Sequence, residues 1–244
     1  MLLIAAVILA VPAAWAEVDI KNHQMHHKDN GIFYIIGELE NNLNVPVQNV
    51  RVTVQPYSAD GTPLDSIEAG AFMRTIIPDM KSPFEIIVRD AKIHSVHSYD
   101  LDVMYEIGEP KSQVIDIESS QLAMDRLDNL IISGSIVNRG DITANGVSVV
   151  ATLYGNDGNV VAVSRTFTEP DYLRADDRIN FTVLVPEQSM TDTIASYSLA
   201  AESEEYASIP EFPAVLVVFL AGLVGICLLT RQMRYGIPVY VGGR

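Results

Sequence analysis

Apolar residues alternate with other residues in two stretches of the chain, 49–57 and 146–154, which read NVRVTVQPY and GVSVVATLY. This period of two, with many valines and threonines, is typical of β-strands. An Asp-Gly pair follows each stretch, at 60–61 and 157–158, and predicts a type I′ hairpin turn. The stretches PFEIIV and NFTVLV predict later strands of the same kind. We therefore expect antiparallel β-structure, because helical patterns are weak outside the C-terminal region.

The same residues recur at an offset of 97 positions, which indicates an internal duplication. The identical pairs include Gly37 and Gly134, Asn41 and Asn138, and Tyr57 and Tyr154. A glycine inside a strand predicts a β-bulge or a close approach of another backbone. A tyrosine at a strand end predicts a buried ring with its hydroxyl at the rim.

Each copy holds several short predicted strands separated by turn signals over about 90 residues, a spacing typical of a β-sandwich. We therefore predict an all-β fold with two tandem immunoglobulin-like β-sandwich domains, at residues 17–110 and 111–205. The exported part contains no cysteine, because Cys227 lies in the apolar C-terminal stretch. A domain without disulfides must rely on its hydrophobic core.

The N-terminus predicts a signal peptide at residues 1–16. Its apolar run ends in small residues, and we expect cleavage after Ala16. No lysine or arginine precedes this run, which departs from the usual pattern.

The C-terminus predicts a linker at 206–213, a single transmembrane helix at 214–230 and a tail at 231–244. An apolar stretch of this length is close to what a bilayer core requires. Arg231 and Arg234 follow the helix and mark the cytoplasmic side. The sequence therefore predicts a single-pass protein of the cell membrane, with its N-terminal domains outside and its tail in the cytoplasm.

The formal net charge of −15 predicts a surface that repels nucleic acid. The chain holds no G-x-S-x-G, no P-loop and no H-E-x-x-H motif. We therefore predict that the protein is not an enzyme and has no small-molecule substrate.

The first copy contains all five histidines, and they offer a candidate metal site. His23, His26 and His27, with Met25 among them, could hold Cu²⁺ or Zn²⁺, and His94 and His97 follow in the same copy. The second copy has Ser120, Ala123 and Met124 at the positions of the first three histidines. The alternative is a solvated loop or strand edge in which the histidines bind nothing.

Asn180 begins an N-x-[ST] sequon, which predicts a glycosylation site on an exported protein. The alternative is a chance occurrence, because Asn180 also begins a predicted strand.

Each copy resembles the FxLYD family, and it also resembles the CARDB-type adhesion domains, most clearly in the segment 134–162. The resemblance is carried by a strand with G-x-x-x-N, then V-x-V, then Y-x-x-D-G, and finally a spaced Phe strand. It extends over both copies and implies immunoglobulin-like or fibronectin-like sandwiches of prokaryotic surface proteins. It implies no catalytic residue.

Pro210, Glu211 and Phe212, followed by an apolar helix and arginine, resemble the PEF-CTERM sorting signal of archaeal surface proteins. That family implies an archaeosortase, which removes the helix and links the remainder to a lipid. The tail from Arg231 to Arg244 is longer than the sorting pattern has. We therefore expect a retained anchor, and the alternative is removal of the helix.

These features predict a non-enzymatic, membrane-anchored protein of the archaeal cell envelope that acts as a structural, adhesive or protein-binding module. Its partners would be the membrane and other envelope or membrane proteins. One alternative is an exported copper- or zinc-binding protein. Another is an accessory subunit of a membrane complex, which would pack through Ala221, Gly222 and Gly225.

Overall fold

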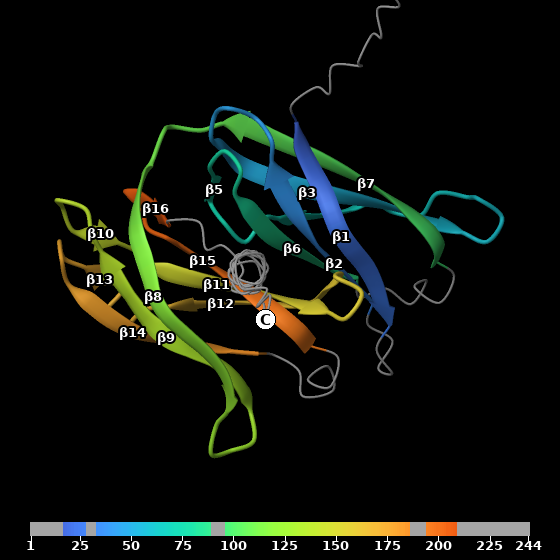
Figure 1. Ribbon diagram of the computed structural model, residues 1–244. Helices are drawn as coiled ribbons and strands as arrows, with labels where there is room; N and C mark the ends of the chain where they lie inside the picture. Colours follow the sequence, from blue (N-terminus) through green and yellow to red (C-terminus); the bar gives the residue numbers. More distant parts are fainter. Residues whose placement is uncertain (1–16, 28–32, 89–95, 186–193, 209–244) are drawn as a thin grey trace, which may run out of the picture. The chain divides into compact units, whose positions relative to one another are not determined.

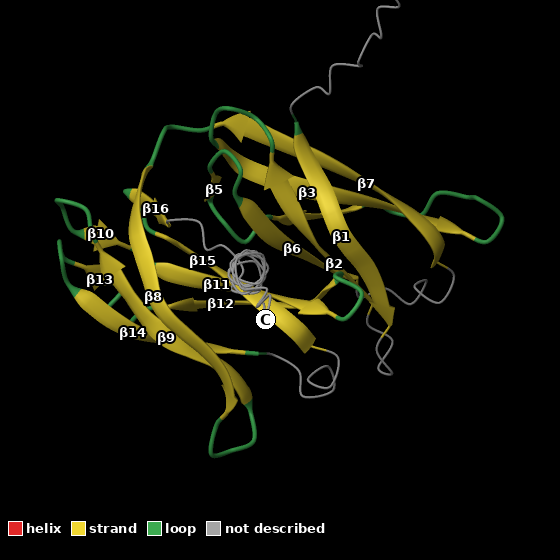
Figure 2. Cartoon of the chain, viewed as in Figure 1, coloured by secondary structure: helices red, strands yellow, loops and turns green. Residues whose placement is uncertain are grey.

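The computed structural model describes residues 17–27, 33–88, 96–185 and 194–208, and all of them are strands or loops (Figures 1 and 2). The prediction of an all-β fold is confirmed for these residues. None of them belongs to a helix long and apolar enough to cross a membrane. The chain divides into two units, Met1–Ile209 and Pro210–Arg244, and every described residue belongs to the first.

Several predictions concern residues outside the described ranges. These are the signal peptide with its cleavage after Ala16, the Pro210-Glu211-Phe212 motif, the transmembrane helix at 214–230 and the tail at 231–244. They stay predictions.

Repeat 1, residues 18–107, forms two sheets (Figure 1). In the first sheet β2 lies between β1 and β6, and all pairs are antiparallel. In the second, β3 pairs with β4 and β5 along one edge and with β7 along the other. The strands are β1 (Val18–His27), β2 (Phe33–Asn41), β3 (Val47–Ser58), β4 (Ile67–Gly70), β5 (Thr75–Ile76), β6 (Lys81–Val88) and β7 (Val96–Ile107).

Repeat 2, residues 112–208, repeats this plan with one addition. The arrangements β8-β9-β14 and β12-β11-β15 correspond to the two sheets of repeat 1, and β16 joins them into one sheet of seven strands. The short strands β10 and β13 pair with each other. The strands are β8 (Ser112–Met124), β9 (Leu130–Asn138), β10 (Ala144–Asn145), β11 (Ser148–Gly155), β12 (Val160–Phe167), β13 (Tyr172–Leu173), β14 (Arg178–Leu184), β15 (Ile194–Glu202) and β16 (Tyr206–Ser208).

The strand positions recur at the offset of the sequence repeat. β2 and β9 have the same bounds after a shift of 97 residues, and so do β5 and β13. β16 has no counterpart among the described strands of repeat 1, and it occupies residues predicted as the start of the linker. It forms because Ser203 Oγ accepts hydrogen bonds from the N–H groups of Glu205 and Tyr206, which turns the chain back against β15 and β8.

The inner faces of the sheets carry equivalent residues in the two cores. Alternation places Ile35 and Leu39 of β2, and Ile132 and Ile136 of β9, on the buried side. Phe84 and Phe181 fill the same place on β6 and β14. A period of two with one apolar face therefore explains both repeats.

The repeated glycines lie where the adjacent strand bulges. One extra residue occurs in β1 between Lys21 and Gln24, and another in β8 between Ile117 and Ser119. A Cβ atom on Gly37 would lie 2.6 Å from the Cβ of His23, and one on Gly134 would lie 2.1 Å from the backbone oxygen of Ser119. The predicted bulge is thus confirmed beside both glycines, and the predicted close approach of a backbone is confirmed at Gly134.

Asn41 and Asn138 tie together the loops at one end of each repeat. Both are fully buried. The Asn41 side-chain amide donates to the carbonyls of Val45 and Ile76, at 2.9 and 2.8 Å. Asn138 makes the equivalent bonds 97 residues later, to Ile142 and Leu173 at 2.8 and 2.9 Å. The repeated asparagine is therefore a structural residue, which satisfies backbone groups that would otherwise be buried unpaired.

The Asp-Gly hairpins occur where they were predicted, but the prediction of type I′ turns is wrong. The N–H of Gly61 donates to the carbonyl of Ser58, and the N–H of Gly158 to that of Gly155. Within each turn only the glycine has a positive φ, 82° in both cases. This matches a type I turn followed by a left-handed glycine, because a type I′ turn needs positive φ at both central residues.

Candidate binding surfaces

The outer face of the β1-β2-β6 sheet is buried around Ile36 and Glu38, although alternation places these residues away from the core of repeat 1. Ile36 is 3% exposed and Glu38 is fully buried. Both residues contact repeat 2. We call this contact the junction, and its main residues are Ile36, Glu38, Phe72 and Arg74 of repeat 1 and Tyr154, Val160, Val163, Arg165 and Glu202 of repeat 2.

The apolar part of the junction is a small cluster centred on Ile36. Ile36, Val160 and Val163 are buried together, and Phe72 and Tyr154 pack against them. The side-chain amide of Gln24 donates to the backbone carbonyl of Val160 at 2.5 Å. Val150 of β11 also joins the apolar cluster of repeat 1. The junction therefore brings the outer face of one sheet in repeat 1 against the outer face of the β12-β11-β15 sheet in repeat 2.

Glu38 holds the first polar contact of the junction. Its carboxylate accepts hydrogen bonds from Asn22 Nδ2 at 2.5 Å, Lys81 Nζ at 2.7 Å and the hydroxyl of Tyr154 at 2.7 Å. Burial raises the pKa of the Tyr154 hydroxyl, and the negative charge of Glu38 raises it further. Tyr154 therefore stays protonated and donates, and the buried carboxylate is paired on both oxygens.

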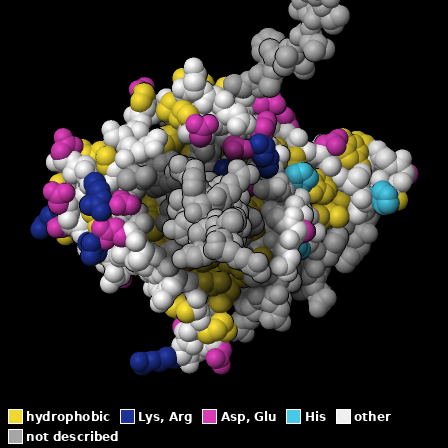
Figure 3. Space-filling model, viewed as in Figure 1, with side chains coloured by type: hydrophobic (Ala, Val, Ile, Leu, Met, Phe, Trp, Pro, Cys, Tyr) yellow, Lys and Arg dark blue, Asp and Glu magenta, His cyan; other side chains and the backbone are white. Residues whose placement is uncertain are grey.

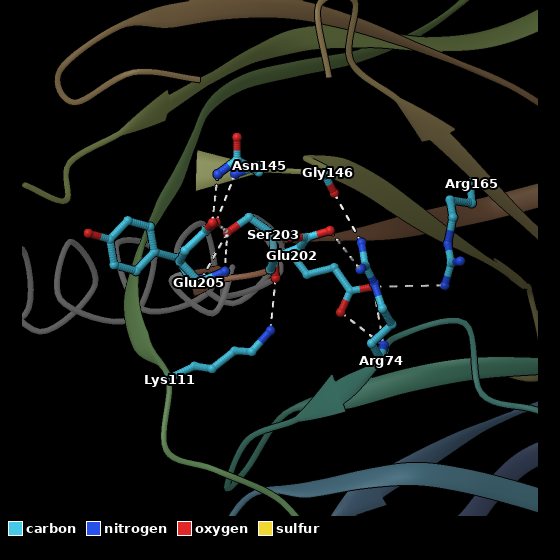
Figure 4. Close-up of polar contacts among 10 residues, drawn as sticks. Arg74, Lys111, Asn145, Gly146, Arg165, Glu202, Ser203 and Glu205 are labelled. Carbon is cyan, nitrogen blue, oxygen red and sulfur yellow. Dashed lines mark hydrogen bonds and ion pairs between the residues drawn. The ribbon is translucent and has the colours of Figure 1, made fainter. Parts of the chain in front are cut away.

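Glu202 holds the second polar contact, at the end of β15 (Figure 4). It is 1% exposed, and its carboxylate accepts hydrogen bonds from the backbone N–H of Arg74 at 2.9 and 3.2 Å. The nearest guanidinium nitrogens of Arg74 and Arg165 lie 3.7 and 3.9 Å away. Burial raises the pKa of Glu202, and these donors oppose the rise.

Arg165 faces Phe72 as well as Glu202. Its guanidinium carbon lies 5.6 Å from the centre of the Phe72 ring, within the range of a cation–π contact. Burial lowers the pKa of Arg165, and the charge of Glu202 counters it. The Nε atom of Arg165 is buried without a hydrogen-bond partner in the described part of the chain. The positive charge of Arg165 is therefore stabilised by the carboxylate of Glu202 and by the Phe72 ring.

A turn next to Glu202 is fixed from several sides (Figure 4). Lys111 Nζ donates to the carbonyl of Ser203 at 2.8 Å, and Arg74 donates to the carbonyl of Gly146 at 3.2 Å. The carboxylate of Glu205 accepts from the N–H and the side-chain amide of Asn145, at 2.8 and 2.7 Å. Residues from both repeats thus hold the end of β15 in place.

The corresponding outer face of repeat 2, on β8, β9 and β14, is not covered by the other described strands. Ser133 and Ser135 stand at the positions of Ile36 and Glu38. The face forms an open hollow of about 470 Å³, and most of its lining residues carry a hydroxyl or amide group. We call it the open face, and its lining includes Ser119, Ser120, Gln121, Ser133, Ser135, Asn180 and Thr182.

Asn180 lies on this open face, in β14. It is exposed, opposite Ser135, and the exposed Thr182 of the same sequon lies opposite Ser133. The structure thus places the sequon on the surface, and glycosylation of Asn180 stays a prediction.

His23 and His26 make contacts on different sides of β1. The Nδ1 atom of His23 lies 2.9 Å from the hydroxyl of Tyr99 in β7, and the two rings meet edge to face. His26 instead feels the charge of Asp157 in repeat 2, and its Nε2 atom is buried without a partner in the described residues. Desolvation lowers the pKa of both imidazoles. The structure does not bring these two histidines to one site.

Among the described residues, no group of three or more His, Cys, Asp or Glu side chains could hold a metal ion. The histidines visible in Figure 3 form separate spots on that face. The side chain of His27 and all of His94 lie outside what the structure describes. Metal binding by His23, His26 or His27 stays a prediction.

The junction residues were missed by sequence reasoning, although a signal existed. Ile36 and Glu38 replace the serines found in the second copy, and Val150 replaces Thr53 of the first. An outward position that is apolar in only one copy indicates a contact that only that copy makes.

Residues 112–207 match the profile of a family described as a protein of unknown function, DUF3426. The match covers most of repeat 2 and less than half of the chain. A search of curated proteins gives no match.

Several solved structures match most of this chain at low similarity. A β-glucuronidase from glycoside hydrolase family 2 is 11% identical over 80% of this chain and 25% of its own, with a TM-score of 0.31. Red sea bream transglutaminase is 8% identical over 77% and 30%, with a TM-score of 0.24. The exo-chitosanase CsxA of Amycolatopsis orientalis is 10% identical over 80% and 26%, with a TM-score of 0.25. The chain thus spans about a quarter to a third of their lengths. The similarity is too low to indicate any activity of this chain. The described fold is all-β and β-sandwich-like, and residues 112–207 are similar to the DUF3426 family.

Proposed function

We propose that this chain is a non-enzymatic, membrane-anchored protein of the cell envelope that binds another envelope protein outside the cell. In this proposal two tandem immunoglobulin-like modules are held near the membrane by the C-terminal helix at 214–230. The apolar stretches at both ends of the sequence support the location. The resemblance to FxLYD and CARDB-type domains supports the kind of module.

The observation that carries the binding role is the contrast between two equivalent sheet faces. Repeat 1 uses the outer face of β1, β2 and β6 to bind a β-sheet of repeat 2. Repeat 2 leaves the same face open, with hydroxyl and amide groups in place of the junction residues. A face of this kind suits a polar, wet protein contact, in which hydroxyl groups and bridging waters supply the hydrogen bonds.

A photo-crosslinking amino acid at Ser133 or Thr182 of the full chain, in native membranes, tests this role. We expect adducts with one envelope protein, because both positions lie on the open face. Asp65 and Asp171 are exposed positions away from that face and serve as matched controls. Equal adducts from all four positions would count against a binding role for the open face.

Peptide mapping of the native protein tests the location. We expect Glu17 as the first residue of the mature chain and peptides from Tyr235–Arg244 in the membrane fraction. Loss of the tail peptides, together with a lipid-sized mass addition, would instead indicate removal of the helix.

The alternative of a copper- or zinc-binding protein gains no supporting observation from the described residues, because His23 and His26 contact different neighbours.

A further inference from the structure

β7 is an edge strand of repeat 1 and has one free side. Its residues pair with β3 from Val96 to Ile107, and no other described strand pairs with it (Figure 1). A strand edge of this length offers a row of backbone N–H and C=O groups to any extended chain. Natural proteins usually protect such an edge by a bulge, a proline, a charge or a covering segment.

Repeat 2 covers the equivalent place with its own chain. β15 follows β7 at an offset of 98 residues, so that Glu202 corresponds to Met104. At Glu202 the chain turns, and β16 pairs with that end of β15. In repeat 1 the strand runs on to Ile107 and nothing equivalent to β16 occurs in the described residues.

Apolar side chains gather at this uncovered end. Met104, Tyr105 and Ile107 are 54%, 36% and 60% exposed, which makes them three of the large exposed hydrophobic residues within four positions. Burial of such side chains by a partner would stabilise a complex, because it removes apolar area from water.

Carboxylates mark the outward face of the same strand. Asp100, Asp102 and Glu106 are all exposed and alternate along β7 on the side opposite Leu101 and Val103, which pack on the core. The side chain of Asp100 is hydrogen-bonded to the hydroxyl of Tyr57, and the carboxylate of Glu106 accepts a hydrogen bond from the side-chain amide of Asn49 at 2.7 Å. The Asp102 side chain makes no hydrogen bond or ion pair within the described part of the chain.

These charges disfavour a second copy of the chain as the occupant. In an antiparallel pairing of β7 with itself, centring on Met104 places Asp102 opposite Glu106, and centring on Asp102 places that residue opposite itself. Centring on Leu101 or Val103 also opposes two acids, whereas centring on Tyr105 opposes none, so the charges disfavour most self-pairings and not all of them. Like charges directly opposite each other destabilise a sheet.

From these observations we propose that the free edge of β7 binds an extended, basic segment of a protein partner, which adds to the sheet as an antiparallel strand. Alternating lysine or arginine side chains of the segment face Asp100, Asp102 and Glu106, and its apolar side chains cover Tyr105 and Ile107. This proposal rests on the proposed protein-binding role, and it names a second surface and the chemistry of what binds there. Strand addition of this kind takes its affinity from backbone hydrogen bonds and its selectivity from alternate side chains.

The test uses the full chain in a neutral detergent and a capped eight-residue peptide of alternating lysine and valine. Hydrogen exchange should slow at least about fivefold in the peptides that cover Val96–Ile107 when the probe is saturating, because ladder hydrogen bonds protect amides. The same lysine–valine peptide with every backbone nitrogen methylated has the same charge but no backbone donors, and it should give no protection there.

Charge reversal sharpens the test. Asp102→Lys should weaken binding of the lysine–valine peptide about fivefold and favour a glutamate–valine peptide instead, since cross-strand charge pairs are each worth up to about 1 kcal/mol. Asp65→Lys changes the net charge equally and should leave binding unchanged. Ile107→Ser alters a side chain that is 60% exposed and should weaken binding without unfolding the chain.

The proposal is overturned if the lysine–valine peptide gives no protection of β7 at millimolar concentration, or if the N-methylated peptide binds equally well. Equal loss in Asp102→Lys and Asp65→Lys, or self-association of the chain that protects β7, would also overturn it. Crosslinking from Ser133 and Thr182 does not involve β7. If Ser133 and Thr182 still crosslink to an envelope protein while the lysine–valine peptide does not protect β7, the β7 proposal is rejected and the proposed function stands.

Discussion

The two repeats share one strand plan and differ in which outer face they cover. Repeat 1 buries the outer face of β1, β2 and β6, and leaves that of β3 in water, with Arg51 exposed. Repeat 2 does the reverse, since Val150 of β11 is buried while Asn180 of β14 is exposed. The inner faces are similar because both repeats need the same core. Contacts between the repeats therefore depend on a few outward residues. Substitutions of these residues should have different effects on stability in the two repeats, whereas the shared core should respond alike.

Removal of Glu202 should give the largest effect that is specific to one repeat. Glu202→Ala removes the carboxylate beside Arg165. We expect the free energy of unfolding to fall by about 3 kcal/mol. This is the low end for a broken buried ion pair, because both arginines keep some hydration. The equivalent change in repeat 1, Met104→Ala, affects an exposed side chain and should cost less than about 0.5 kcal/mol. Urea unfolding of the full chain, followed by circular dichroism, compares the two. Equal losses would mean that Glu202 does not stabilise the junction.

Gly134→Ala should destabilise repeat 2 by about 2 kcal/mol, because the added methyl group would lie 2.1 Å from the backbone oxygen of Ser119. Gly37→Ala should cost less in repeat 1, since the nearest atoms lie farther away, the Cβ of His23 at 2.6 Å and the ring of Phe84 at 2.9 Å. Gly70→Ala, whose nearest contact would be 3.9 Å away, serves as the control. The same unfolding measurement ranks the three. A smaller loss for Gly134 than for Gly37 would reverse the order that the geometry predicts.

The repeated tyrosines offer a matched pair with different roles. Tyr154→Phe removes a hydrogen bond to the buried Glu38 and should cost about 1.5 kcal/mol. Tyr57→Phe removes a solvated hydrogen bond to Asp100 and should destabilise the chain much less than Tyr154→Phe. Hydrogen exchange of β2 amides should rise in Tyr154→Phe alone. If exchange rises equally in both variants, the Tyr154–Glu38 bond does not couple the repeats.

A fall in pH should give the smallest difference in stability between the two repeats. Desolvation lowers the pKa of His23 and His26 in the folded chain, so that folding favours their neutral forms. Their contribution is present above the ordinary histidine pKa of about 6.5 and is lost as the pH falls from there through the folded values. Repeat 1 should thus lose protection against exchange between about pH 7 and pH 5 relative to repeat 2. His23→Ser with His26→Ala introduces the residues of the second copy and should remove the difference. A difference that persists in this variant would place its origin elsewhere.

The all-β fold, the duplication and the irregularity at Gly37 and Gly134 could be predicted from the sequence. These features depend on alternation and on the size of one side chain, and both are local. The turn type could not be predicted from Asp-Gly alone, because Gly61 sits after a type I turn whose hydrogen bond begins at Ser58.

The junction could not be predicted from one copy, because alternation tells which side a residue faces and not what lies there. Glu38 and Glu202 look like ordinary surface acids in the sequence, yet both are buried by a partner sheet. The histidines show the opposite case. His23 and His26 are neighbours in the sequence, but they are three residues apart along β1, so alternation sends their side chains to opposite faces.

The contact between the repeats also has a consequence for how such proteins change in evolution. It joins two different faces of the same kind of module, so it is heterologous and does not close on itself. A third copy of the module could be added through the same kind of contact. Its outward residues would have to be equivalent to Ile36 and Glu38 on one face, or to Tyr154 on the other. Lengthening by duplication would then require a few surface substitutions and no new core, as in arrays whose units contact only their nearest neighbours.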